Sequence, residues 1–402
     1  MRCMSRCAAA PGRDLGVKIF FAVPRSAWVD LNLRRSLEDM GHELVRFDFP
    51  GWPDDSDHGW IRYEKPRTNE RLLEAVRRAV PFDLFFGYFY SSVAYPETIQ
   101  HIGKAGVPTV NFSCNNVHQF DLVRDIAAQF DLCWVPEQAA QADFLRVGAR
   151  PVRIQLAANP RVYRPVPTPR VYDVTFVGQR YADRAELLSH LFDNGVNVRV
   201  WGAGWQTQKR LDVAQLKAGL ALIEDERLDG IRRMVRRRVS RWRAGVFAPN
   251  DSRDVSQTGV LADRGVQSPV DTSAFGGPRL LQRDLVRMFS RSRVSLGFAT
   301  AGESHKSQKR LTHLRLREFE APMSGALYLT EHQPELAEYF EPGQEVLTYS
   351  DRDELLDKAR FYLARQEQAE RIRRNGYLRS IREHTWQHRF RQLFAELGLP
   401  SR

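Results

Sequence analysis

The stretch LRLREFEAPMSGALYLT, residues 314–330, is the part of the sequence that decides the fold. Its pattern predicts a charged helix, broken at Pro322 and Gly325, and then an apolar strand over residues 326–329. In open α/β sheets, phosphate-bearing ligands bind where a helix start or a strand end meets a glycine turn. Arg317 can bind a phosphate, and Glu320 on the next turn can accept from ribose hydroxyls. This combination is typical of a nucleotide-sugar pocket.

Strands and helices alternate on both sides of this stretch. Apolar runs with the character of buried strands are followed by segments with helical periodicity. The strands expected in the first half cover residues 17–23, 42–49, 83–89, 109–112, 131–135 and 152–156. Those expected in the second half cover residues 172–177, 196–201, 294–298, 326–329 and 345–349. Such alternation predicts the α/β fold class, with parallel sheets covered by helices on both faces.

The proline-rich residues 157–169 have no clear periodicity and indicate a linker between the two halves. We therefore expect a disordered tail, two doubly wound domains and a C-terminal helix. Their predicted bounds are residues 1–16 for the tail, 17–165 and 170–385 for the domains, and 386–402 for the helix. Residues 206–280 form an insertion in the second domain. This insertion is predicted to be helical at first, and a mobile or disordered loop where Ser, Asp, Thr and Gly dominate.

Composition indicates a globular protein that binds anionic partners. The chain has 402 residues, of which 43% are apolar, and a formal charge of +11. No apolar run approaches the ~20 residues that a membrane-spanning helix needs. The four cysteines lack the spacing of a metal site, and the sequence has neither a Walker loop nor an HExxH motif. We therefore expect a cytoplasmic protein with no metal and no bound cofactor.

Two glycine turns follow predicted strands of the second half. Gly178 can let a phosphate approach the backbone, and Arg180 or Arg184 can meet its charge. Gly202 and Gly204 end the next strand and also permit close approach of a ligand. Ordinary tight turns, with solvated arginines and core tryptophans, explain these patterns as well. Both interpretations stay open.

Two further candidates lie in loops. Lys309 belongs to a basic loop before residues 314–330 and can close over a diphosphate. His118 follows the strand at residues 109–112, where ligands bind in such sheets, and it can take the proton of an acceptor hydroxyl. Asn115 and Asn116 can position that hydroxyl. A solvated loop and a structural histidine are the alternatives.

Residues 231–247, IRRMVRRRVSRWRAGVF, combine seven arginines with apolar residues at helical spacing. A basic amphipathic helix can lie on an anionic membrane, where a lipid-linked acceptor would be found. The alternative is a helix packed on its own domain with a solvated basic face. Nucleic-acid binding is not expected, because neither an aromatic-interleaved strand nor a zinc pattern accompanies the charge.

Three blocks of the second half resemble the glycosyltransferases of the CgeB (spore-maturation) type, relatives of the group 1 transferases. The blocks are residues 173–205, residues 285–299 with 313–349, and residues 354–394, and the first half matches more diffusely. The resemblance implies two Rossmann-like domains that face each other across a cleft (the GT-B fold), with the sugar-nucleotide donor on the second and the acceptor on the first. It also implies a metal-independent reaction, in which arginine, lysine and helix dipoles stabilise the departing diphosphate.

The resemblance also assigns roles to single residues. Glu320 falls on the second glutamate of the family, which is expected to accept from the donor ribose. Related transferases carry another glutamate eight positions earlier, where this chain has Thr312. Contacts to phosphate and sugar are then left to Arg317, Lys309 or Gly178. Kinship with group 1 implies retention of configuration.

The predicted function is that of a hexosyltransferase-type glycosyltransferase. It moves a sugar from a nucleoside-diphosphate sugar to a hydroxyl of a glycan or envelope-type acceptor. In this interpretation Arg317 stabilises the leaving diphosphate, Glu320 holds the ribose, and His118 activates the acceptor. The alternative is a catalytically inactive scaffold of the same fold that retains donor binding, an interpretation that Thr312 favours.

Overall fold

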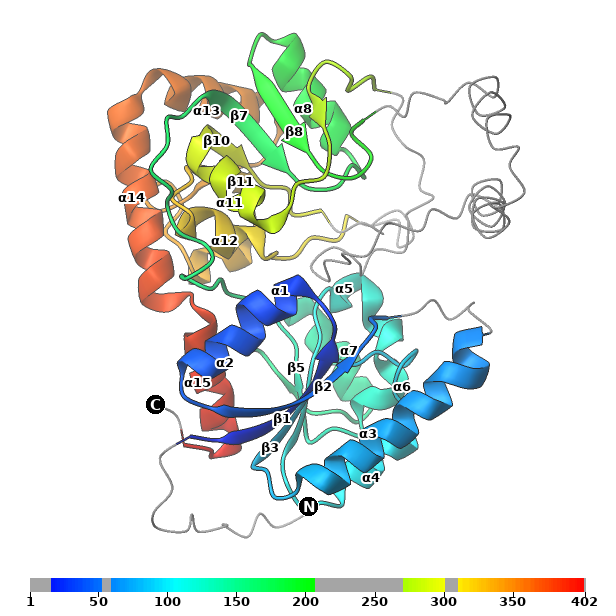
Figure 1. Ribbon diagram of the computed structural model, residues 1–402. Helices are drawn as coiled ribbons and strands as arrows, with labels where there is room; N and C mark the ends of the chain where they lie inside the picture. Colours follow the sequence, from blue (N-terminus) through cyan, green and yellow to red (C-terminus); the bar gives the residue numbers. More distant parts are fainter. Residues whose placement is uncertain (1–15, 53–58, 207–269, 301–309, 401–402) are drawn as a thin grey trace, which may run out of the picture.

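The computed structural model describes residues 16–52, 59–206, 270–300 and 310–400. It shows two α/β units, each built on a six-stranded sheet. Figure 1 shows the two units one above the other, with helices packed around each sheet. All neighbouring strands in both sheets are parallel. The predicted fold class, two doubly wound α/β units, is confirmed.

The first sheet is apolar along its central strands because helices cover both of its faces. Phe20, Phe21, Phe85 and Phe86 are all fully buried in it. In spatial order its strands are β2 (Glu43–Phe49), β1 (Lys18–Pro24), β3 (Leu84–Gly87), β4 (Thr109–Phe112), β5 (Leu132–Trp134) and β6 (Pro151–Val152). Its helices are α1 (Ala27–Val29), α2 (Arg35–Asp39), α3 (Lys65–Ala79), α4 (Pro96–Gly103), α5 (Asn116–Gln119), α6 (Arg124–Ala127) and α7 (Gln141–Arg146).

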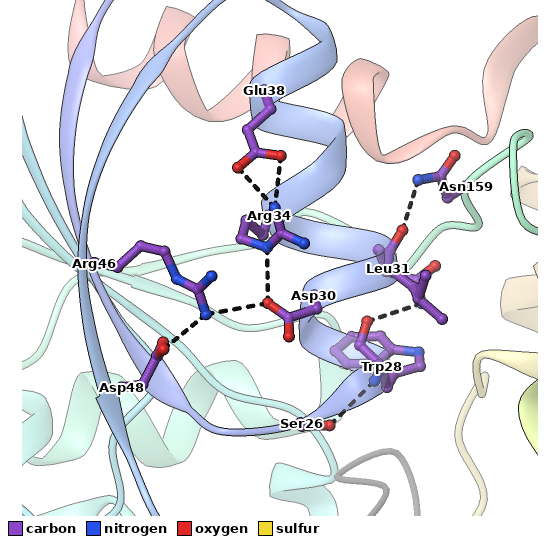
Figure 2. Close-up of polar contacts among 10 residues, drawn as sticks. Ser26, Trp28, Asp30, Leu31, Arg34, Glu38, Arg46, Asp48 and Asn159 are labelled. Atoms are coloured by element: carbon purple, nitrogen blue, oxygen red, sulfur yellow. Dashed lines mark hydrogen bonds and ion pairs between the residues drawn. The ribbon is translucent and has the colours of Figure 1, made fainter.

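The first helix begins directly after the carboxyl end of β1. The Ser26 hydroxyl accepts from the backbone N–H of Trp28 at 3.2 Å and caps the helix. Further along, Arg34 pairs with Asp30 and with Glu38 at 2.7 Å each, one turn before and one turn after it (Figure 2). The cap fixes where the helix starts, and it thereby places Trp28 at the edge of the sheet that faces the second unit.

The second sheet has the same design, with Val174, Val198, Val294 and Leu329 in its core. In spatial order its strands are β12 (Leu347–Tyr349), β11 (Tyr328–Glu331), β10 (Ser292–Leu296), β7 (Tyr172–Val177), β8 (Val198–Trp201) and β9 (Gly276–Gly277). Its helices are α8 (Arg184–Asp193), α11 (Gln282–Arg291), α12 (Arg317–Met323), α13 (Arg352–Ala364) and α14 (Gln366–Glu383), with a 3₁₀ turn, η7 (Pro334–Glu338).

The last helix, α15 (Trp386–Leu397), returns to the first unit. Figure 1 shows it beside α2, far from the sheet that precedes it in sequence. Trp386 is fully buried, packs edge-on against Trp28 at 5.6 Å, and donates to the Asn32 side chain at 3.2 Å. Phe390 packs against Phe86 at 5.9 Å. The chain therefore crosses between the units twice, once in the linker and once before α15.

Several expected elements differ in detail. The helix of residues 314–330 begins only at Arg317, and Pro322 lies inside its last turn instead of breaking it. Three helices, α13, α14 and α15, close the described part of the chain. Gly276 and Gly277 form the edge strand β9 within a segment predicted to be a loop. The tail at residues 1–15 and most of the predicted insertion, residues 207–269, lie outside the described residues.

Candidate active site

A cavity lies between the two units, at the carboxyl ends of both sheets. The first unit lines it with Trp28, Tyr88 and Asn115, among others. Tyr88 directly follows β3, and Asn115 lies three residues beyond the end of β4. The second unit lines it with residues that follow β7 and β10, such as Gly178 and Gly297. This is the position at which parallel α/β sheets bind their ligands.

Arg184, the first residue of α8, is the most deeply buried cation in the cavity wall, at 4% exposure. One guanidinium nitrogen donates to the Gln179 carbonyl at 2.9 Å and another to the Tyr181 hydroxyl at 2.5 Å. The guanidinium also stacks on the Tyr181 ring at 3.7 Å. Among the described residues, its Nε has no hydrogen-bond partner. Burial lowers the pKa of Arg184 to about 10, so the group stays charged at neutral pH.

Two more arginines come from the segment that decides the fold. Arg315 donates to the Thr300 carbonyl at 2.6 Å, while its buried Nε has no partner in the part of the chain that the structure describes. Arg317 pairs with Glu320. Both arginines line the cavity together with Arg184, and none of the described residues that line it is a carboxylate. The second unit therefore presents three cations to the cavity, an arrangement that suits a diphosphate.

Glu320 lies behind this wall and does not itself line the cavity. It is fully buried. One carboxylate oxygen accepts from the Tyr163 hydroxyl and the other from Arg317. The ribose contact expected of Glu320 stays a prediction, and the structure gives its carboxylate two partners from the protein instead.

Of the three predicted glycines, one lines the cavity and the other two lie where neighbouring loops touch. Gly178 lines the cavity at the end of β7. Gly202 has φ +152°, and a Cβ there would lie 1.9 Å from the Gly178 carbonyl oxygen. Gly204 has φ +83° and lies against the Cβ of Arg180. These two glycines are needed because the loops after β7 (Tyr172–Val177) and β8 touch, and neither glycine lines the cavity.

Arg180, a predicted donor-binding residue, turns away from the cavity. It donates to the Val270 carbonyl at 2.6 Å and to the Thr272 hydroxyl at 3.2 Å, in the segment before β9. The alternative that the sequence left open, Arg184, is the one whose side chain reaches the cavity. Lys309 lies outside the described residues.

On the side of the first unit, His118 lines the cavity from α5. Its ring lies 5.7 Å from the ring of His313, which belongs to the second unit. Nε2 of His313 and Oδ1 of Asn115 are 3.2 Å apart, so this contact joins the two units. Burial, aided by the nearby Arg315, holds the pKa of His313 well below its usual range. His313 is therefore neutral and Nε2 is the donor.

The structure also shows two buried carboxyl groups beside the cavity that the sequence did not single out. Glu137 accepts from the backbone N–H of Asn115 and from the Asn116 side chain. Glu318 accepts from the backbone N–H of Arg315 at 2.8 Å. Burial raises the pKa of each to about 7. Glu137 lies two residues beyond the predicted strand at residues 131–135, a position that could have identified it.

Two features are absent from residues 16–52, 59–206, 270–300 and 310–400. Within these ranges, no group of three or more His, Cys, Asp or Glu side chains could hold a metal ion. Among the described helices, none is long and apolar enough to cross a membrane.

Residues 265–395 match a family model described as glycosyl transferase-like. No curated protein sequence matches this chain. The structure is similar to sucrose-phosphate synthase from Thermosynechococcus elongatus, with 14% identity and a TM-score of 0.53, covering 94% of this chain and 100% of that one. It is also similar to Anabaena HepE in complex with UDP-glucose, with 11% identity, a TM-score of 0.53 and coverage of 95% and 99%.

A glycosyltransferase from Rickettsia africae is similar too, with 8% identity, a TM-score of 0.54 and coverage of 95% and 98%. At these identities the likeness describes the fold alone. The expected GT-B architecture is confirmed, and the narrower CgeB-type assignment stays a prediction. The chain has the two-unit GT-B fold, and its residues 265–395 are similar to the glycosyl transferase-like family model.

Proposed function

We propose that this protein transfers a sugar from a nucleoside-diphosphate sugar to a hydroxyl group of a glycan or lipid-linked acceptor. The observation that carries the proposal is the charge of the cavity wall. Arg184, Arg315 and Arg317 line a cavity at the carboxyl ends of two parallel sheets, and the described lining contains no carboxylate. Such a site favours a ligand with a compact double negative charge.

In the proposed reaction the acceptor oxygen forms a bond to the anomeric carbon, and the bond from that carbon to the diphosphate breaks. The three arginines stabilise the negative charge that develops on the leaving diphosphate, as a metal ion would in other enzymes. His118, on the opposite wall, is the candidate group to receive the proton of the acceptor hydroxyl. Retention of configuration is part of the proposal and rests on the resemblance to group 1 transferases.

The comparisons support this choice of substrate class. The glycosyl transferase-like match, over residues 265–395, includes Arg315 and Arg317 but not Arg184. Anabaena HepE, of similar fold, was solved with UDP-glucose. Cytoplasmic location and contact with an anionic membrane through residues 231–247 are further parts of the proposal, and that segment lies outside the described residues.

A panel of nucleotide sugars tests the proposal in two steps. A ligand present at 100 times its Kd should stabilise the protein by about 2.7 kcal/mol, measured as a rise in Tm. The sugars that raise Tm are then incubated with candidate acceptors, and release of the nucleoside diphosphate is measured. Absence of any thermal shift across the panel would contradict the proposal.

The second candidate function is a scaffold that binds the donor without turning it over. Thr312 favours it, because related transferases have a glutamate there. In the structure Thr312 pairs with Thr300 in an isolated antiparallel bridge. A thermal shift without any release of nucleoside diphosphate, across all donors and acceptors, would support this function instead.

A further inference from the structure

Tyr163 lies in the linker, on a turn that is fastened to the first unit. Its backbone N–H donates to the Asn159 carbonyl at 2.8 Å. The Asn159 side chain in turn donates to the carbonyl of Leu31 at 2.7 Å, a contact that Figure 2 shows. The Tyr163 side chain is fully buried. Its position is therefore set by the first unit, although its hydroxyl reaches α12 of the second.

The partner of that hydroxyl is the carboxylate behind the cavity wall. Tyr163 donates to one oxygen of Glu320, and Arg317 pairs with the other. Glu320 is fully buried, whereas Arg317 keeps 18% of its side chain exposed and lines the cavity. A buried carboxylate needs both of its partners, so the loss of one changes how it holds the other.

We propose that Tyr163 is a positioning residue for the donor: through Glu320 it holds the guanidinium of Arg317 toward the cavity. Without the hydroxyl, the carboxylate takes further N–H groups of Arg317 and draws the guanidinium away from the ligand. Because the linker turn follows the first unit and Arg317 follows the second, affinity for the diphosphate depends on how the two units are oriented. This inference rests on the proposed function, since it assumes that Arg317 binds a diphosphate.

The test is a double-mutant cycle in the full-length protein, with UDP, GDP and ADP as probes and isothermal titration calorimetry as the measurement. Tyr163→Phe keeps the buried ring and removes the hydroxyl. We expect it to weaken binding of the preferred nucleoside diphosphate by roughly 5-fold, and to leave binding of the matching nucleoside unchanged. In an Arg317→Ala background the same change should have no further effect.

Two other variants are measured beside Tyr163→Phe, one as a control and one as a second test. Tyr172→Phe removes a hydroxyl at the amino end of β7, away from the cavity, and should leave affinity unchanged. Glu320→Gln should reproduce the selective loss, which keeps the test valid if Tyr163→Phe does not fold. Equal losses in both backgrounds, or no loss from Tyr163→Phe, would overturn the positioning role while the proposed function stands. If the wild-type protein binds none of the three probes, the proposed function fails and this inference fails with it.

Discussion

The ionisable groups on the two walls of the cavity differ in their charge. On the wall from the second unit, Arg184, Arg315 and Arg317 keep permanent charges although they are wholly or partly buried. Their burial is tolerated because backbone carbonyls, the Tyr181 ring and Glu320 surround them. This wall offers fixed cations in a setting with little water, where they interact strongly with an anion.

On the opposite wall, from the first unit, burial favours the neutral forms of the ionisable groups. Burial raises the pKa of Cys114 to about 12 and that of Glu137 to about 7. Such groups exchange hydrogen bonds and protons with hydroxyls without attracting a charged ligand. Under the proposed function, the contrast assigns the donor diphosphate and the acceptor hydroxyl to opposite sides of the cavity.

The largest expected effect comes from the cationic wall. Arg315→Ala removes a charge aimed at the diphosphate, and kcat/KM for the nucleotide sugar should fall by about 10²–10³-fold. Steady-state kinetics with the preferred donor provide the measurement. Arg287→Ala, which removes an exposed charge of the same domain at 65% side-chain exposure, is the matched control and should change little. Equal losses in the two variants would mean that only net charge matters.

The neutral wall should respond in kcat and not in donor affinity. In the proposed reaction His118→Gln removes the group that receives the acceptor proton, and kcat should fall by about 100-fold. Calorimetry with the nucleoside diphosphate should give an unchanged Kd. His101→Gln changes an exposed histidine on α4 of the same unit and serves as control. Weaker binding of the nucleoside diphosphate by His118→Gln would mean that His118 contacts the donor, which would contradict the separate roles of the two walls.

A buried carboxyl on the neutral wall predicts a pH dependence of stability. The pKa of Glu137 is raised to about 7, so the folded protein binds this proton more tightly than the unfolded chain does. Its contribution therefore favours the folded state at pH 5 and is lost as pH rises through 7. From pH 5 to pH 8 the free energy of unfolding of Glu137→Gln, measured in urea, should rise relative to wild type by about 2 kcal/mol.

Glutamine cannot accept from both of the donors that Glu137 binds, so Glu137→Gln also loses some stability that does not depend on pH. The measurement that tests the prediction is therefore how the difference in free energy of unfolding between variant and wild type changes with pH. Glu97→Gln, at an exposed position of α4, should show no such slope. A flat difference between Glu137→Gln and wild type would mean that Glu137 is ionised in the folded protein and that the two walls are more alike.

The smallest expected effect concerns the support of the cationic wall. Glu320→Ala leaves the buried Tyr163 hydroxyl and Arg317 without their shared partner. The free energy of unfolding of the ligand-free protein should fall by about 1.5 kcal/mol, measured in urea. The sequence assigns Glu320 to the donor ribose, and a residue with that role alone could be lost without a change in the stability of the ligand-free protein. An unchanged stability would favour that earlier interpretation.

The fold followed from local patterns, whereas the site followed only in part. Apolar runs such as that of β1 identify buried strands, since helices must cover both faces of a parallel sheet. The apolar face of α15 predicts a helix but does not indicate which part of the protein it packs against, so its contact with Trp28 of the first unit was not predicted. Likewise, the sequence proposed Arg180 or Arg184 for one role. Only the three-dimensional path of the loop after β7, with Arg180 held by Val270 and Thr272, distinguishes the two.

The most direct test of the account is a crystal structure of the protein with the nucleoside diphosphate that raises its Tm most. The account predicts that the two phosphates lie within hydrogen-bond distance of Arg184 and Arg315, with Arg317 completing the contact. Phosphates bound elsewhere, with these three guanidinium groups left as they are in the free protein, would contradict it.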